Sequence, residues 1–576
     1  MKIASFTRVA NVSELVGPGP FALSADGVDL AVVHTQDGWR AFEGRCPHLG
    51  ALLGEGEIEG GYLVCRNHRW RFDLASGQRT GGPERLASCA IVERNGAIFA
   101  DVSSLKHGAE KQTAARKLHE LPGPRALPFV GNLHQIDQKS VHLVLERWAA
   151  RYGSVYTFRL GRDRAVAVSD PRLIDHVLRE RPEAFRRSST LDRILVEVGT
   201  RGVFNAEGDV WRPQRKLTVA ALSQRHLRDV YPHIKTVAER LHRRWRGLAS
   251  AGADAEIVEE LKRFTVDVTM LIVFGHDANT VEQDGDDITE RLSVLLPTIS
   301  RRLFAPVPTW RFLRLPRDRH FDRCIAEVRS WLSQLIADAR KRAAAAAGEP
   351  ERSSFLDAMV KATDENGRAY CDDVIASNLF ILLLAGEDTT ANSLAWAIHL
   401  LADHPEWARR IGTEADSLLR DAIAPGDLDA ANALPVASAV ANEAMRLKPV
   451  APVLLMEANV DTSIADIEIP RGTVVAILSR PAALTDDHFV EAQAFRPQRW
   501  LEPPDGAHDL SAHIPFGSGP RMCPGRALAL VEMNTLLALL YKNYEVERQG
   551  RSEDVREDFG FVMSPTGLKV RLRPRV

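Results

Sequence analysis

Two short segments near the start of this 576-residue chain each carry one cysteine and one histidine. Cys46 and His48 stand two positions apart, and Cys65 and His68 stand three apart, so each segment offers one thiolate and one imidazole. Two such pairs suit a 2Fe-2S cluster with both thiolates on one iron and both imidazoles on the other. Two cysteines and two histidines also suit tetrahedral zinc. A zinc finger groups its ligands by type, whereas each segment here is mixed, which favours the iron-sulfur cluster.

A third cysteine stands in a glycine-rich motif near the end of the chain, Phe516-Gly-Ser-Gly-Pro-Arg-Met-Cys523-Pro-Gly. Pro is favoured at the first position of a helix, so the apolar run 527–540 is expected to be a helix with Cys523 at its N-terminus. Free N–H groups and the positive end of the helix dipole stabilise a thiolate there. Glycines at positions 517, 519 and 525 let the backbone fold tightly beneath a flat cofactor. The motif predicts a thiolate ligand to haem iron.

The bulk properties indicate a multidomain protein that acts on small molecules. The chain is too long for one ordinary core, and its net charge of −2 does not favour nucleic acid or an anionic membrane surface as a partner. Residues 1–30 carry no pattern of a secretory signal. The apolar stretches 380–385 and 527–540 are broken by acidic or amide side chains and are expected to be buried helices. We therefore expect a cytoplasmic protein without a membrane span.

Two regions of different periodicity follow one another along the chain. Residues 1–102 contain short apolar runs separated by Gly, Asp and Pro, which predicts a small all-β unit. Residues 103–120 lack apolar periodicity and are predicted to be a linker. In residues 121–576 helical periodicity dominates, with one β-rich patch at 474–478. Helices are expected at 142–151, 171–180, 230–248, 322–347, 372–401, 436–447 and 524–539. The expected fold class is a small all-β domain followed by a large, mainly α domain with minor sheets.

The first region resembles a Rieske [2Fe-2S] ferredoxin domain. The segments CPHLGALLGEGEIEGG and CRNHRWRFDLASG, with the later Gly82-Pro83, follow that family's two ligand loops and its proline loop. The resemblance implies that the two cysteines and two histidines hold a [2Fe-2S] cluster, and it supports an electron carrier. Arg69 departs from the family, because many relatives have glycine after the second histidine.

Basic side chains flank the four expected cluster ligands. They form either a solvated basic rim or a surface that favours the reduced cluster and docks an acidic reductase or the second domain. The side chains concerned are Arg45, Arg66, Arg69 and Arg71.

The region from Leu121 to Val576 resembles a cytochrome P-450. The resemblance implies haem b bound through Cys523, within a loop that includes Phe516 and Gly525. It also implies contacts to the haem propionates from four side chains, Trp211, Arg215, His513 and Arg521. The family's Glu-x-x-Arg scaffold matches Glu443 and Arg446, with Arg499 as its third member. The Glu-x-x-Arg matches at 183/186, 260/263 and 553/556 are interpreted as surface pairs.

Acidic and hydroxyl residues interrupt an apolar helical stretch at Ala385-Gly386-Glu387-Asp388-Thr389-Thr390. Such groups cost free energy inside a helix unless they are partnered or functional. Ala385 and Gly386 leave room for dioxygen beside the iron. The resemblance assigns Asp388 and Thr389 to a proton relay that supports heterolytic cleavage of the O–O bond.

These parts predict a haem-thiolate monooxygenase that carries its own Rieske electron-transfer domain and acts on O2 and a small apolar organic substrate. The sequence has no flavin motif and no Gly-x-Gly-x-x-Gly after a strand, so a separate NAD(P)H-dependent flavoprotein ferredoxin reductase is implied. The alternatives are a redox or gas sensor without turnover and a peroxide-driven peroxygenase. A Rieske non-haem oxygenase needs two His and one carboxylate on a further iron, and no suitably spaced set occurs. Arg193 and Arg201 are candidates for contacting a substrate carboxylate.

Overall fold

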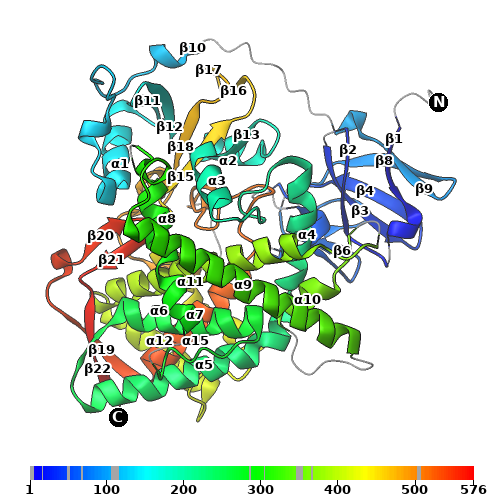
Figure 1. Cartoon of the computed structure of the whole chain (residues 1–576). Helices are drawn as coiled ribbons and strands as arrows, with labels where there is room; N and C mark the ends of the chain where they lie inside the picture. The colour runs from blue at the N-terminus through cyan, green and yellow to red at the C-terminus, as the bar shows by residue number, and fades with distance from the viewer. Residues whose placement is uncertain are drawn as a thin grey trace.

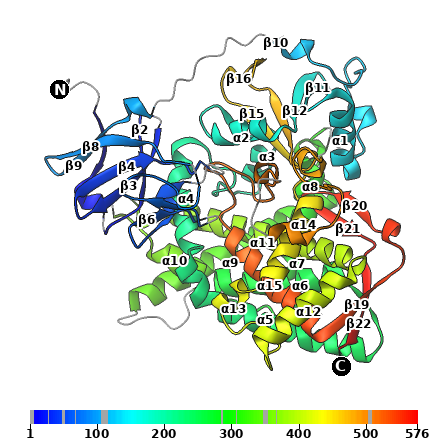
Figure 2. The same ribbon diagram turned by 180° about the vertical axis from the view of Figure 1, so that it is seen from behind.

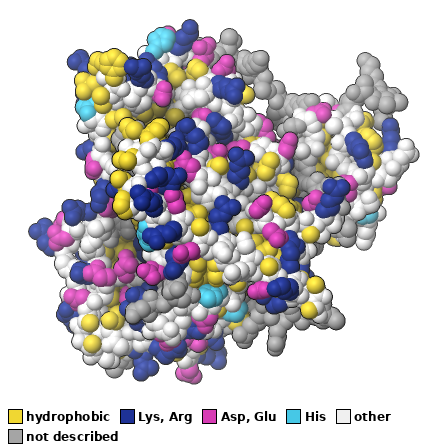
Figure 3. Space-filling view, viewed as in Figure 1, with side chains coloured by type: hydrophobic (Ala, Val, Ile, Leu, Met, Phe, Trp, Pro, Cys, Tyr) yellow, Lys and Arg dark blue, Asp and Glu magenta, His cyan; other side chains and the backbone are white. Residues whose placement is uncertain are grey.

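The computed structural model describes residues 6–15, 17–26, 28–47, 52–66, 69–82, 84–105, 116–283, 287–303, 305, 307–345, 354–364, 367–501 and 508–575. These residues form a small β lobe, blue in Figure 1, and a larger, mainly helical lobe beside it (Figures 1 and 2). The expected fold class is confirmed. Lys and Arg are interspersed with Asp and Glu on the face shown in Figure 3, in keeping with the small net charge.

The N-terminal lobe contains two antiparallel sheets. The larger sheet has the strand order β1-β9-β8-β4-β3-β2, and the smaller has the order β5-β6-β7. The strands are β1 (Thr7–Asn11), β2 (Phe21–Ala25), β3 (Val28–Thr35), β4 (Gly38–Glu43), β5 (Glu57–Glu59), β6 (Tyr62–Val64), β7 (Arg71–Asp73), β8 (Ser88–Arg94) and β9 (Ala97–Asp101).

Strand β3, next to the edge strand β2, is buried on both faces, which explains its continuous apolar run. Ala31 and Val33 pack in the apolar cluster that also holds Cys46 and Cys65. Leu30 and Val32 point to the opposite face and pack in a second cluster. Because successive side chains of a strand alternate between faces, one strand contributes to both cores.

Helix α11 (Asp372–Ala402) runs through the centre of the larger lobe and packs against α6, α14, α9 and α15. It is buried on most sides, in keeping with an apolar sequence around its circumference. Among the described helices, α11 alone is long and apolar enough to cross a membrane by length and composition. The remaining helices are α1 (Val141–Tyr152), α2 (Pro171–Arg179), α3 (Ser189–Glu197), α4 (Trp211–Ala221), α5 (Gln224–Ser250), α6 (Ile257–Thr269), α7 (Asp287–Ser293), α8 (Leu295–Leu303), α9 (Pro316–Ala345), α10 (Phe355–Lys361), α12 (Pro405–Leu419), α13 (Leu428–Asn432), α14 (Pro435–Leu447) and α15 (Arg526–Asn543).

The strands of the larger lobe form small peripheral sheets. The largest has the order β11-β12-β18-β15-β13, and the others are β10-β17-β16, β14-β22-β19 and β20-β21. Within the stretch predicted to be a linker, β10 pairs in parallel with β17. The strands are β10 (Arg116–Lys117), β11 (Val155–Leu160), β12 (Asp163–Val168), β13 (Phe185–Arg187), β14 (Asp254–Glu256), β15 (Val453–Ala458), β16 (Thr462–Ile464), β17 (Ile467–Ile469), β18 (Val474–Leu478), β19 (Tyr544–Gln549), β20 (Arg556–Phe559), β21 (Met563–Thr566) and β22 (Lys569–Pro574).

Candidate iron-sulfur and haem-thiolate sites

The two N-terminal cysteines follow strands β4 and β6 and are buried in one apolar cluster. His48 and His68, the other two predicted ligands, lie outside the described residues. Among the residues that are described, no group of three or more His, Cys, Asp or Glu side chains has a metal-binding arrangement. The structure therefore brings together the thiolate half of the predicted donor set, and the imidazole half stays a prediction.

Two backbone hydrogen bonds connect Cys65 with Trp70 and Arg69. The N–H of Cys65 donates to the carbonyl of Trp70 at 2.8 Å, and the N–H of Arg69 donates to the carbonyl of Cys65 at 3.0 Å. Arg69 has a φ of +57°, the left-handed conformation that glycine adopts most readily. Arg69, which stands where many members of the family have glycine, therefore adopts a strained backbone conformation.

The four basic side chains that flank the predicted cluster ligands divide into two pairs. Arg69 forms ion pairs with Glu57 and Glu59 on the exposed edge of the small sheet. Arg71 lies over the ring of Tyr62 on the same side. Arg45 and Arg66 instead reach toward the larger lobe. The predicted basic rim is thus split between an outer face and a contact between the domains.

The loop before Cys523 is folded as a tight turn. Gly517 and Gly519 have φ values of +74° and +72°, and the Cys523 N–H donates to the Phe516 carbonyl at 2.9 Å. Helix α15 begins only at Arg526, with Gly525 as its N-cap at a φ of −83°. The helix was expected to begin at Pro524, and that expectation is wrong by two residues. Gly525 also needs no special backbone conformation.

The Cys523 side chain is accessible, although protein surrounds it on most sides. Burial raises the pKa of this thiol, and the N–H of Gly525 and the guanidinium groups of Arg215 and Arg66 oppose the increase. A bound ferric ion would add a much larger charge in favour of the thiolate. Ala385, in the middle of the central helix, is likewise exposed. Both features fit a flat cofactor between α11 and the cysteine loop.

Three of the four residues predicted to contact the propionates carry buried polar atoms without a hydrogen-bond partner among the described residues. These atoms are Trp211 Nε1, His513 Nε2 and Arg521 Nε and Nη1. An unpaired buried donor is costly, and the two carboxylates of haem are the acceptors that such donors would satisfy. The Arg521 guanidinium also lies 4.3 Å from the centre of the Trp211 ring. The residues present therefore fit haem.

Burial sets the protonation of two of these groups. It lowers the pKa of His513 to about 3, so the imidazole is neutral and can donate one hydrogen bond. It also lowers the pKa of Arg521 to about 9, and Arg181 contributes to this shift. Glu207 forms ion pairs with both Arg521 and Arg181. Sequence analysis missed Glu207, because nothing in its local sequence marks it as a partner of the cysteine loop.

Arg215, the fourth predicted propionate contact, has a different environment. Its Nη1 donates to the carbonyl of Met522 at 2.7 Å, next to the thiolate. Its Nε and Nη2 lie 3.2 and 3.3 Å from the two carboxylate oxygens of Glu55, which belongs to the N-terminal domain. Sequence analysis did not anticipate this partner.

The predicted proton relay lies on α11 where that helix contacts α6. The Thr389 hydroxyl donates to the carbonyl of Ala385 at 2.8 Å. Lys262 Nζ lies 3.1 Å from Asp388 Oδ1. Burial and the neighbouring Asp388 raise the pKa of Glu387 to about 7. Gly386 allows the close approach of α6, since a Cβ there would lie 2.6 Å from Thr269 Oγ1.

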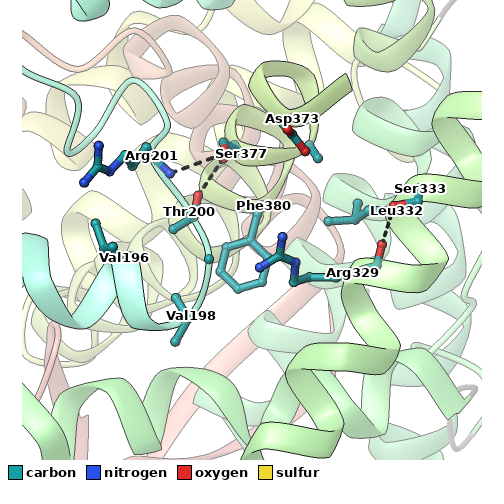
Figure 4. Close-up of a pocket in the computed structure, with 12 residues that line it drawn as sticks. Val196, Val198, Thr200, Arg201, Arg329, Leu332, Ser333, Asp373, Ser377 and Phe380 are labelled. Carbon is teal, nitrogen blue, oxygen red and sulfur yellow. Dashed lines mark hydrogen bonds between the residues drawn. The ribbon is translucent and has the colours of Figure 1, made fainter. Parts of the chain in front are cut away.

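A cavity of about 370 Å³ opens between the 196–201 segment, α9 and the first turns of α11 (Figure 4). Phe380, Val196, Val198 and Leu332 contribute apolar side chains to its lining, and Arg329 and Asp373 contribute charged ones. The Thr200 hydroxyl and the Arg201 N–H both bond to Ser377. Of the two arginines proposed to meet a substrate carboxylate, Arg201 lines this cavity, whereas Arg193 bonds to its own helix.

The Glu443 carboxylate organises the scaffold below the site. It accepts hydrogen bonds from Arg446, Arg499 and the indole of Trp500, at 2.8–3.1 Å, and also from the Arg496 N–H. Glu443 and Arg446 are fully buried. The matches at 183/186, 260/263 and 553/556 do not pair internally: Arg186 bonds Glu457, Glu260 bonds Arg244, and Glu553 bonds Arg551. Glu260 is also buried, so its interpretation as a surface residue is wrong.

A cysteine in a tight loop before α15, a long central helix that packs against α15 and carries acidic and hydroxyl residues, and a β domain with two buried cysteines together indicate a haem-thiolate protein with a fused iron-sulfur domain. Residues 121–572 match the family Cytochrome P450, and residues 5–91 match the Rieske [2Fe-2S] domain. The chain belongs to the cytochrome P-450 family. It is a cytochrome P-450 monooxygenase whose two domains imply haem and a [2Fe-2S] cluster as cofactors.

Curated relatives match the haem domain at low identity. Protein LUTEIN DEFICIENT 5, chloroplastic, of Arabidopsis thaliana is 25% identical over 78% of this chain and 77% of the relative. Cytochrome P450 3A13 of Mus musculus is 27% identical over 74% of this chain and 85% of the relative. The mitochondrial 25-hydroxyvitamin D-1 alpha hydroxylase of Homo sapiens is 29% identical over 79% of this chain and 92% of the relative.

Proposed function

We propose that this enzyme inserts one atom of O2 into an apolar organic substrate, with electrons from a separate NAD(P)H-dependent flavoprotein ferredoxin reductase that enter through the Rieske domain. Haem held by Cys523 supplies the binding and reductive activation of O2. The proposal rests on the polar segment 385–390 that interrupts the apolar sequence of α11. In this segment the Thr389 hydroxyl bonds to Ala385, and the neighbouring Asp388 carboxylate pairs with Lys262.

Each side chain at this break has a role in handling protons. The Thr389 hydroxyl donates to the Ala385 carbonyl and keeps its lone pairs free to accept a hydrogen bond from a proton donor. Asp388 is held by Lys262 at the α6 side of the helix, where it can exchange protons with water. A sensor without turnover does not need this pair.

The substrate proposal rests on the cavity of Figure 4. The apolar part of its lining, from Phe380, Val196, Val198 and Leu332, suits an apolar molecule. Arg201 and Arg329 add positive charge at the same cavity, and Asp373 adds a negative charge. A screen of apolar compounds with and without a carboxylate, read by shifts in the haem spin state, tests this proposal. Mass spectrometry of the hits after turnover with a reductase identifies the product.

Thr389→Ala tests the reaction class. We expect the variant to keep consuming NAD(P)H while product falls at least tenfold, because the proton relay contributes roughly 10²-fold or more. Thr413→Ala is the matched control, since the exposed Thr413 of α12 makes the same bond to a carbonyl four residues earlier. Unchanged coupling of NAD(P)H to product in Thr389→Ala would contradict a monooxygenase.

Replacing the predicted cluster ligands His48 or His68 tests the electron route. A peroxygenase keeps full activity with peroxide and is indifferent to these changes. The proposed enzyme loses turnover supported by NAD(P)H while its haem still binds substrate.

A further inference from the structure

Two arginines next to the predicted cluster cysteines point toward the haem domain, and each meets an acid of its own domain. Arg45, which precedes Cys46, places its Nε 2.8 Å from Asp29 Oδ2. Arg66, which follows Cys65, places its Nη1 3.2 Å from Glu55 Oε2. The acids are well buried, with side chains 4% and 10% exposed. A buried carboxylate needs such partners.

The same two acids also meet two arginines of α4, on the haem domain. Arg212 Nη1 lies 3.0 Å from Asp29 Oδ1, and Arg215 bonds both oxygens of Glu55. Positions 212 and 215 are three residues apart, so their side chains leave the helix on one face. The result is two parallel bridges across the domain boundary, Arg45–Asp29–Arg212 and Arg66–Glu55–Arg215.

The bridges continue to the loop that holds Cys523. Arg215 donates to the carbonyl of Met522 at 2.7 Å, and Arg66 Nη2 lies 3.5 Å from the carbonyl of Pro524. The residues on both sides of the thiolate are thus bonded to the second bridge. Leu52 of the N-terminal domain belongs to an apolar cluster that also contains Trp211 and Val203 of the haem domain.

Charge complementarity makes this contact specific. Each acid of the Rieske domain lies between two guanidinium groups, so separating the domains removes one cationic partner from each acid. The covalent connection between the domains strengthens the contact further. It is short, because the described part of the Rieske domain ends at residue 105 and β10 begins at residue 116. A tether of this length gives an effective concentration on the order of millimolar. An interface of only micromolar intrinsic affinity would then be docked about a thousandfold more often than open.

We propose that the two bridges hold the Rieske domain on the thiolate side of the haem domain as a permanent internal docking surface, closing that side to any separate iron-sulfur protein. Asp29, Glu55 and Arg212 are its positioning residues. The proposal builds on the proposed function, because it assumes that electrons reach the haem from the Rieske domain. The reductase must then dock on the outward face of the Rieske domain.

Charge reversal at one bridge tests the docking in the full-length holoenzyme. Arg212→Glu sets an acid against Asp29, and Arg212→Lys keeps the opposite charge. Arg551→Glu is the control, because it makes the same charge change on the far β-rich edge, where Arg551 pairs only with Glu553 among the described residues. Glu55→Gln, which keeps the size of the side chain, tests the second bridge. Each variant must first show wild-type haem and cluster spectra.

The first measurement is the rate of haem reduction, trapped with carbon monoxide, after flash reduction of the Rieske domain. We expect the wild-type rate to be independent of protein concentration and nearly independent of salt, because buried pairs are weakly screened. In Arg212→Glu the rate should fall at least tenfold and become salt-dependent, whereas Arg212→Lys and Arg551→Glu should stay within about twofold of wild type. A salt-dependent wild-type rate, or a wild-type rate in both Arg212→Glu and Glu55→Gln, overturns the proposal.

The second measurement is small-angle X-ray scattering at low and high salt. The wild type should keep one compact radius of gyration, and Arg212→Glu should expand. Expansion of the wild type in high salt overturns the docking. The two proposals can fail separately. If the reduction and scattering results are as expected but no substrate yields an oxygenated product, the proposed function is wrong and the docking proposal is retained.

Discussion

Lys262 on α6 and Asp388 on α11 form an ion pair, with Nζ 3.1 Å from Oδ1. Burial works against the charged ammonium, but the attraction of Asp388, with smaller contributions from Glu259 and Glu387, outweighs burial and raises the pKa of Lys262. The side chains of Lys262 and Asp388 are 31% and 15% exposed, so the pair connects the protein surface to the polar break of the central helix. The acid of the proposed relay is therefore held in place by a residue of another helix.

Lys262→Met should uncouple the enzyme. Without the ammonium, the Asp388 carboxylate loses its fixed orientation, and misplacement of a catalytic group by a small distance costs on the order of tenfold or more in rate. We expect about tenfold less product per NAD(P)H consumed, measured as product yield against NAD(P)H oxidation. Lys262→Arg should stay within about twofold of wild type. Equal yields in Lys262→Met and wild type would show that the pair is only structural.

Glu443→Gln should destabilise the haem domain. The carboxylate is fully buried between two guanidinium groups and the indole of Trp500. Removing one charge from a buried network leaves the others uncompensated and costs about 3–5 kcal/mol. Urea unfolding and haem content measure the effect. Glu553→Gln, at a side chain that is 71% exposed, is the control and should change stability by less than about 0.5 kcal/mol. Similar losses in both variants would refute the scaffold role.

Regular elements with a long periodic pattern were predictable from sequence. The expected helix at 372–401 is observed at Asp372–Ala402, and the β-rich patch at 474–478 is observed as β18. Helix α4, which contains Pro213 in its first turn, was not predicted, and neither were α6 and α12. The start of α15 was predicted too early, since Pro524 lies before the N-cap rather than at the first helical position.

The site was predictable where its residues share one loop, and not where its partners come from elsewhere in the chain. Cys523 and the glycines of its loop are a local motif. Glu55, Glu207 and Lys262 become neighbours of the site only after folding, with sequence separations of more than a hundred residues from Arg215, Arg521 and Asp388. No spacing rule links such residues, so their pairing is a property of the tertiary structure.

Glu532→Gln should change how stability depends on pH. Burial raises the pKa of this carboxyl on α15 to about 8, against the opposing effect of a hydrogen bond with Thr390. Between the unfolded value of 4.5 and about 8, the native state keeps a proton that the unfolded state releases. The wild type should therefore lose stability as pH rises through this window, by on the order of 4 kcal/mol.

Glutamine is neutral at every pH, so Glu532→Gln should have a flatter profile and exceed the wild type at pH 8 by about 3 kcal/mol. Urea unfolding at pH 5 and pH 8 measures the difference, and Glu553→Gln corrects for the general effect of a lost charge. Parallel profiles for wild type and Glu532→Gln would mean that the carboxyl is ionised in the native protein.

Gly386→Ala should destabilise the enzyme although it places a better helix former in α11. Alanine in a helix interior ordinarily stabilises by about 1 kcal/mol relative to glycine. Here its Cβ would lie 2.6 Å from Thr269 Oγ1, and Thr269 is a short, buried side chain that cannot move aside. Overpacking of this kind costs about 1–3 kcal/mol.

A double-mutant cycle separates the clash from every other effect of Gly386→Ala. Thr269→Ala removes the hydroxyl that the new methyl group would meet. The double variant should therefore be more stable than the sum of the two single changes by about 1 kcal/mol or more. Urea midpoints of the four proteins measure this coupling. If the two changes are additive, a methyl group at position 386 does not clash with Thr269, and α6 and α11 are not in close contact at this glycine.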